Sequence, residues 1–310
     1  MQTPRNWKAY EANAVMRGNL MLYISPDVAK SWYVTYDKNS NRVKGGQTVY
    51  TDKCIHDVMA LKYLLGFGYR QLEGFIAGLL KLAGLSTLPT PDRTTINIRA
   101  KSLKVRLPAK PNIAAGAVIS LDSTGLKIHG QGEWNRKKHK QRDRARWVKM
   151  HIAIDNNSMQ ILDCVATADD VHDCEVFDEI IDSLNGVPSK VLGDGAYDTI
   201  DAYKKSIEVG FQLVALPREN AGVNNTSTKP HIHARNQQVQ YYQDKGMPAW
   251  ANKNDYWQRN KVETTMSRFV TAFSDRLSSR TVETQKNEIA IKCHLLNIMA
   301  SNNNLQDSAA

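Results

Sequence analysis

The sequence lacks a disulfide framework, a membrane-length apolar run and an N-terminal secretory core. Only four cysteines occur in 310 residues, and they are widely separated with no CxxC pair: Cys54, Cys164, Cys174 and Cys293. Cysteines spaced in this way favour free thiols in a reducing compartment over disulfides or a zinc site. No apolar stretch approaches the roughly 20 residues that span a bilayer, and residues 1–7 lack a signal-peptide core. We therefore expect a cytoplasmic protein with no membrane partner.

Negative charge is scarce relative to positive charge. The chain has 41 Lys and Arg residues against 31 Asp and Glu residues, which gives a formal net charge of +10. This excess favours polyanionic partners, nucleic acid first, although many basic proteins bind nothing specific. Residues 134–146 form the densest basic run, and we expect its cations to contact DNA phosphates: Arg136, Lys137, Lys138, Lys140, Arg142, Arg144 and Arg146.

Helical periodicity begins after an N-terminal segment and linker, residues 1–50. Apolar residues recur at helical spacing in residues 52–65 and 69–82, and Asp92 precedes a third, basic helix. Two helices followed by a basic one are typical of a helix-turn-helix DNA-binding domain, here residues 51–110, whose last helix enters the major groove. A helical bundle that merely carries surface charge is the alternative. The candidate DNA contacts on the third helix are Arg93, Arg99, Lys101 and Lys104.

The pattern changes to that of an α/β domain over residues 111–300. Residues 117–121, 126–130 and 147–154 predict antiparallel strands, and helices and strands alternate after them. This order predicts a ribonuclease-H-like core, a mixed sheet flanked by helices, although periodicity alone does not exclude other α/β folds. Residues 217–254 are polar without steady periodicity, so we expect an insertion or a long loop there. Residues 301–310 predict a disordered tail.

Three carboxylates stand at chemically informative places in this domain. Asp122 directly follows the strand at residues 117–121, Asp194 follows a second short strand, and Glu263 lies in a helical segment. In a ribonuclease-H-like sheet, the first strand is central and the next parallel strand lies beside it, so we expect the two aspartates to meet. Carboxylates are the ligands that Mg²⁺ prefers, and two such ions about 3.5–4 Å apart catalyse phosphodiester cleavage. We expect Asp122 to bridge both ions, Asp194 to hold one and Glu263 the other.

Each acid also has a purely structural explanation. An Asp before Ser-Thr-Gly often caps a turn, Asp-Gly is a common turn dipeptide, and Glu263 can pair with Arg259 one helical turn earlier. The flanking residues add candidates of their own: Arg218, Arg259 and Arg268 for DNA phosphates, Trp250 and Trp257 for base stacking or core packing, and His129, His139, His151 and His172 for tuning pKa values or contacting phosphate.

Short motifs in a fixed order give the chain a family resemblance. They include Leu121-Asp122-Ser123-Thr124-Gly125, Gly193-Asp194-Gly195-Ala196-Tyr197 and the spaced set Tyr256, Arg259 and Glu263. On these motifs the chain resembles bacterial insertion-sequence transposases of the DDE class, most of all the IS-five-type family. The resemblance covers nearly the whole length. A lysine of the family signature is missing, because Val270 stands seven residues after Glu263.

The resemblance implies a helical DNA-binding region and a ribonuclease-H-like catalytic core. It also implies that Asp122, Asp194 and Glu263 bind two Mg²⁺ ions, for which Mn²⁺ can substitute. Tyr256, Arg259 and Arg268 are then expected to contact DNA. The implied reaction is hydrolysis at transposon ends followed by joining of the 3′-hydroxyls to target DNA, in a homodimer or larger assembly near the nucleoid. A transposase-derived DNA-binding regulator and a nuclease that cuts without joining are the alternatives.

Overall fold

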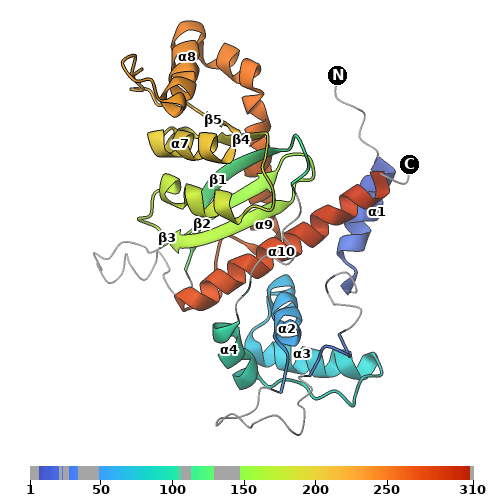
Figure 1. Ribbon diagram of the computed structural model, residues 1–310. Coiled ribbons are helices and arrows are strands. Elements are labelled where there is room, and N and C mark those ends of the chain that lie inside the picture. Colours follow the sequence, from blue (N-terminus) through green and yellow to red (C-terminus); the bar gives the residue numbers. More distant parts are fainter. Residues whose placement is uncertain are drawn as a thin grey trace, which may run out of the picture. The chain divides into compact units, whose positions relative to one another are not determined.

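The computed structural model describes residues 7–20, 23, 28–33, 49–103, 105, 113–128 and 147–307 (Figure 1). The chain forms two compact units, one of Met1–Arg106 with Thr281–Ala310 and one of Leu107–Arg280. The return to the first unit at Thr281 differs from the expected domain boundary at residue 300. Lys104 and the basic run of residues 134–146 lie outside the described residues, as do His129 and His139. Within the described ranges, no helix combines the length and the apolar character needed to cross a bilayer.

The first unit is helical, as the periodicity predicts. Thr51 caps α2, because its hydroxyl accepts from the Cys54 backbone N–H at 3.0 Å. The Asn287 amide of α10 donates to the carbonyls of Ala100 at 3.0 Å and Leu103 at 2.6 Å. These bonds join the C-terminal helix to the end of α4. The helices are α1 (Trp7–Arg17), α2 (Asp52–Leu65), α3 (Tyr69–Leu82), α4 (Arg93–Ser102) and α10 (Val282–Asp307).

The second unit is built on a five-stranded mixed sheet of order β3-β2-β1-β4-β5. The central strand, β1, pairs antiparallel with β2 and parallel with β4, and β4 pairs parallel with β5. With helices on its faces, this is the predicted ribonuclease-H-like arrangement (Figure 1). The strands are β1 (Val118–Lys127), β2 (Trp147–Asp155), β3 (Ile161–Ala168), β4 (Lys190–Gly193) and β5 (Gln212–Ala215).

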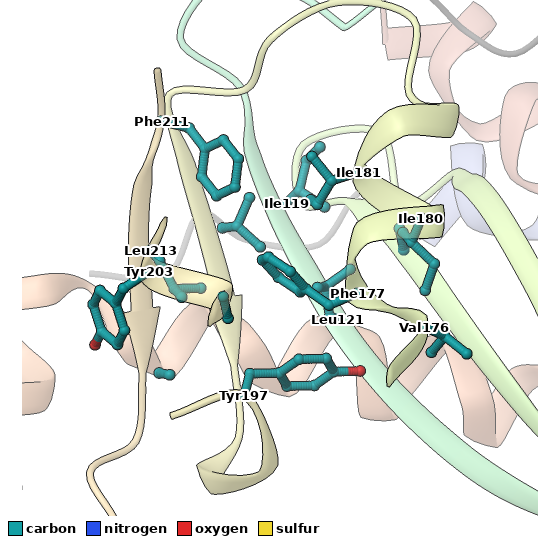
Figure 2. Packing of buried hydrophobic residues seen from close by; sticks show 14 of the residues in the cluster. Ile119, Leu121, Val176, Phe177, Ile180, Ile181, Tyr197, Tyr203, Phe211 and Leu213 are labelled. Carbon is teal, nitrogen blue, oxygen red and sulfur yellow. The ribbon is translucent and has the colours of Figure 1, made fainter. Parts of the chain in front are cut away.

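Helices and short 3-10 turns follow the strands of this unit and cover the sheet. They are η2 (Asp173–Val176), α6 (Phe177–Ser183), η3 (Gly195–Tyr197), α7 (Ile200–Val209), α8 (Pro230–Asn254), η4 (Tyr256–Arg259) and α9 (Asn260–Phe273). One hydrophobic core lies between the sheet and α6 and α7 (Figure 2), with Ile119 and Val191 among its buried residues. The next residue of β4, Leu192, belongs to a second core, with Trp250 and Tyr256. Alternate residues of the strand therefore face opposite layers.

Three segments differ from the expectation. The predicted strands at residues 117–121 and 126–130 form one continuous β1, which pairs with β2 from Ile119 to Lys127 without interruption. Gly125 lies under the Trp147 ring, where a Cβ would be 3.2 Å from Trp147 Cε3. Residues 230–254 form α8, which is broken at Gly246, where φ is 77°. Because of this break, no single helical period runs through the segment. Helix α10 extends to Asp307, inside the predicted disordered tail.

Candidate active site

Asp122 and Asp194 lie beside each other on neighbouring segments of the sheet. Ser120 of β1 is paired with Leu192 of β4 in the parallel ladder, and each aspartate lies two residues farther along the chain, Asp122 within β1 and Asp194 directly after β4. Neighbouring strands lie about 4.8 Å apart, and parallel strands present their carboxyl ends at the same edge. Asp122 is still within β1, where it pairs with Ile152 of β2. The sheet therefore holds Asp122 at its centre, next to the turn that carries Asp194.

The third acid is joined to Asp122 by an arginine. Arg259, at the end of η4, places Nη2 3.1 Å from Asp122 Oδ2 and Nη1 2.6 Å from Glu263 Oε1. The side chains of Arg259 and Asp122 are each 14% exposed, whereas that of Glu263 is 55% exposed. Asp122 Oδ1 accepts from the Ser123 backbone N–H at 2.9 Å. The predicted pairing of Glu263 with Arg259 is therefore present, and Asp122 shares the same guanidinium.

The charges of Asp194 and Glu263 both act on Asp122 and on Arg259. Burial raises the pKa of Asp122, Arg259 opposes that rise, and the charges of Asp194 and Glu263 add to it. Burial by itself lowers the pKa of Arg259, but Asp122, Tyr256, Asp194 and Glu263 together raise it above its usual value. The site therefore concentrates negative charge around one cation in a partly desolvated place.

The turn that carries Asp194 is held from several sides. Asp194 Oδ1 accepts from the Ala196 N–H at 2.9 Å and caps η3. Arg218 Nε donates to Gly195 O at 2.8 Å, and the Tyr256 hydroxyl donates to Gly193 O at 3.1 Å. Arg218 and Tyr256, both candidates for DNA contact, thus fix the backbone on either side of Asp194.

The donor set suits a hard divalent cation, because it consists of carboxylate oxygens on rigid elements. In the part of the chain that the structure describes, no group of three or more His, Cys, Asp or Glu side chains is arranged as a ready metal site. The guanidinium of Arg259 is instead the cation between Asp122 and Glu263. Positive charge is therefore already stabilised at the place where the sequence predicts metal ions.

The other candidates are divided between the two units. In the first unit, Arg93 Nη1 lies 3.5 Å from Glu73, and Arg99 Nη1 donates to Tyr50 O at 2.7 Å, so both have partners within their own unit. Lys101 is exposed on α4. In the second unit, Arg268 is half-buried on α9.

The two candidate tryptophans differ in burial. Trp250 is fully buried and its Nε1 donates to Gln238 Oε1 at 2.8 Å, so it packs in the core. Trp257 is 49% exposed, three residues before the start of α9. No local pattern in the sequence singles out Asp173, which accepts from the Ser123 hydroxyl, or Lys149, which pairs with Asp173.

Most of the chain matches known protein families. Residues 114–298 match a protein family described as Transposase DDE domain, and residues 15–131 match a second family of the same description. The chain belongs to the DDE transposase family. In this DDE transposase, Asp122 lies on the central strand of the mixed sheet and Asp194 follows the adjacent parallel strand.

Three solved structures are similar to this chain at low sequence identity. One is the piggyBac transposase synaptic complex with hairpin DNA, with 10% identity and a TM-score of 0.40 over 99% of this chain and 79% of that chain. Another is the Drosophila P element transposase strand transfer complex, with 9% identity and a TM-score of 0.31 over 95% and 86%. A third is the simian T-cell lymphotropic virus intasome in complex with PP2A regulatory subunit B56 gamma, with 14% identity and a TM-score of 0.25 over 67% and 64%.

Proposed function

We propose that this DDE transposase is a bacterial insertion-sequence enzyme of the IS-five type. It binds the terminal inverted repeats of a transposon, cleaves them by metal-dependent phosphodiester hydrolysis and joins the 3′-hydroxyl ends to target DNA. One observation carries the proposal: Asp122 and Glu263 share the guanidinium of Arg259, and Asp194 lies at the same edge of the sheet. Asp122, Asp194 and Glu263 would hold the divalent ions, Mg²⁺ or Mn²⁺, which when bound activate the attacking oxygen and stabilise the leaving oxygen.

The chain's own residues prepare the site for DNA. The Ser123 N–H fixes one oxygen of Asp122, and the Ala196 N–H fixes one oxygen of Asp194, so both carboxylates are oriented before substrate arrives. Arg259 pairs with Asp122 and Glu263 in the free protein. When DNA and divalent ions bind, the guanidinium can move from Asp122 to a phosphate oxygen. Its forked N–H donors suit such an oxygen well.

The proposed partners follow from charge. The helices of residues 51–110 would read the transposon ends, and the basic residues 136–146 would bind DNA phosphates, with Arg218 and Arg268 as further candidates near the acids. Because such binding releases counterions, affinity for DNA should fall steeply as salt rises. Two transposon ends must be cut and joined together, so we propose a homodimer or larger assembly on DNA.

The test uses the full chain and a DNA duplex that carries the inverted repeats flanking its gene. Asp122→Asn should reduce Mg²⁺-dependent cleavage by about 10³-fold or more, as loss of a central catalytic group does, and leave the gel shift unchanged. Asp201→Asn, an exposed acid in the first turn of α7, is the matched control and should cleave normally. Undiminished cleavage by Asp122→Asn would exclude this site.

The products of the wild-type protein separate the alternatives. Cleaved ends that become joined to a target plasmid support a transposase. Cleavage without joined products would instead indicate a nuclease, and binding to the repeats without any cleavage would indicate a transposase-derived regulator.

A further inference from the structure

A second polar cluster lies on the opposite side of β1 from Asp122. Side chains alternate along a strand, so Asp122 faces Arg259 while Ser123 faces η2 on the other side. The Ser123 hydroxyl donates to Asp173 Oδ2 at 2.9 Å, and the Ser123 N–H donates to Asp122 Oδ1 at 2.9 Å. One residue therefore connects the acid on the catalytic side to a fourth acid behind the sheet.

Asp173 is itself held firmly in place. Lys149 Nζ lies 2.8 Å from Asp173 Oδ1 and also donates to Val171 O at 3.0 Å. His151 is fully buried beside them, with Nδ1 3.5 Å from the same oxygen of Asp173. Burial lowers the pKa of His151 to about 4, so the ring is neutral near pH 7 and Lys149 is the cation that balances Asp173. The side chain of Asp173 is only 12% exposed, which strengthens its hydrogen bond with Ser123 and its ion pair with Lys149.

The cluster also extends toward Asp194. The ring of Tyr197 packs directly on Gly193, the residue before Asp194. Figure 2 shows the Tyr197 hydroxyl pointing toward the segment of Val176, which is the end of η2. Burial raises the pKa of Tyr197 well above its usual value, and the next largest causes are the charges of Asp173, Asp194 and Asp122, in that order. The charge of Asp173 thus acts on Tyr197 in the turn after β4, and its carboxylate also contacts β1 at Ser123.

The part of β1 that carries Asp122 and Ser123 is paired on one side only. The parallel ladder with β4 ends at the pair Ser120 and Leu192, so at Asp122 the strand is bonded to β2 alone. The contact between Ser123 and Asp173 is an additional anchor at this point. A displacement of about 1 Å at a catalytic group can slow a reaction by about 10²-fold.

We propose that Asp173 is a positioning residue of the active site, which acts through the Ser123 hydroxyl to fix the carboxylate of Asp122. The proposal deepens the proposed function and rests on it for the reaction, but not for the binding of ions by Asp122. A contact that only stabilises the fold would lower thermal stability without changing how the site binds a divalent ion.

The test compares Ser123→Ala, Asp173→Asn and the double variant. The first readout is the Mn²⁺ concentration at which the unfolding temperature of the DNA-free protein reaches half of its maximum increase. The second is the rate of cleavage of the inverted repeats. We expect each single variant to raise the Mn²⁺ midpoint about 10-fold and to slow cleavage by 10- to 100-fold. The double variant should stay within about 2-fold of the poorer single variant, because both changes remove one contact.

Matched controls come from the same unit. The Ser183 hydroxyl also donates to an aspartate, Asp163 on β3. Ser183→Ala and Asp163→Asn should lower the unfolding temperature but leave the Mn²⁺ midpoint unchanged. A wild-type midpoint and cleavage rate in Ser123→Ala, or losses that multiply in the double variant, would overturn the proposal. If Asp173→Asn does not fold, Ser123→Ala decides alone, because it removes only a hydroxyl.

The two proposals fail in different ways. A wild-type protein that binds Mn²⁺ through Asp122 but cleaves no DNA would contradict the proposed function, and the midpoint shift in Ser123→Ala would still test the role of Asp173.

Discussion

Arg259 and Asp122 form an ion pair across two elements that are far apart in sequence, with Nη2 3.1 Å from Oδ2 and both side chains 14% exposed. The pair places a positive charge between Asp122 and Glu263, and the charge of Asp194 also acts on it. A divalent ion bound by the same carboxylates would compete with this guanidinium. Arg259 therefore stabilises Asp122 in the free protein, and it must share or release this carboxylate when ions bind.

Replacement of this arginine should make the protein depend on metal for stability. In Arg259→Gln the partly buried Asp122 loses its cation, so the unfolding temperature without divalent ions should fall by about 5–10 °C. Saturating Mn²⁺ should raise the unfolding temperature of Arg259→Gln by more than it raises that of the wild type. Thermal unfolding with and without Mn²⁺ measures both effects. Arg276→Gln, an exposed arginine of the same unit, is the control, and an equal Mn²⁺ shift in all three proteins would contradict the prediction.

The raised pKa of Asp122 gives a stability effect with a definite sign. The folded protein binds this proton more tightly than the unfolded chain, so the free energy of unfolding falls as pH rises from the usual value of 3.8 through the raised one. Asp122→Asn cannot ionise and escapes this loss. Without divalent ions it should match the wild type near pH 4 and have the higher unfolding temperature at pH 7, as thermal unfolding at the two pH values would measure. A less stable variant at pH 7 would mean that the pair with Arg259 outweighs the cost of burial.

Local patterns in the sequence were sufficient for much of the fold. Regular apolar spacing located α2 and α3, Asp92 marked the start of α4, and an apolar run that ends in an acid located both Asp122 and Asp194. These features depend on neighbours within a few residues, where helix and strand periodicity act directly.

The remaining features depend on contacts between distant segments. The bond between Ser123 and Asp173 joins residues 50 positions apart, and nothing near Asp173 in sequence marks it as part of the site. The packing of α10 with the N-terminal helices depends on Asn287 reaching Ala100 and Leu103. Such long-range pairs are set by tertiary structure and leave no local period to read.

Gly193 should tolerate no side chain. A Cβ there would lie 2.7 Å from Cδ2 of the buried Tyr197 ring, whereas a Cβ at Gly195 would meet its nearest atom, Leu216 O, at 3.4 Å. Gly193→Ala should therefore destabilise the protein by about 1–3 kcal/mol, and Gly195→Ala by much less. Chemical unfolding of the two variants measures the difference. Equal losses would show that the Tyr197 ring shifts at little cost.

Asp198 and Arg235 form a bidentate ion pair that ties α8 to the turn after Asp194. Arg235 Nε and Nη2 donate to the two carboxylate oxygens at 2.7 and 2.9 Å, and the Asp198 side chain is 0% exposed. Arg235→Leu would leave this carboxylate buried without its cation, so we expect a loss of about 3–5 kcal/mol in the free energy of unfolding. Lys204→Gln removes the exposed pair with Glu208 and should cost less than about 0.5 kcal/mol. Similar losses in the two variants, measured by urea unfolding, would mean that solvent reaches Asp198.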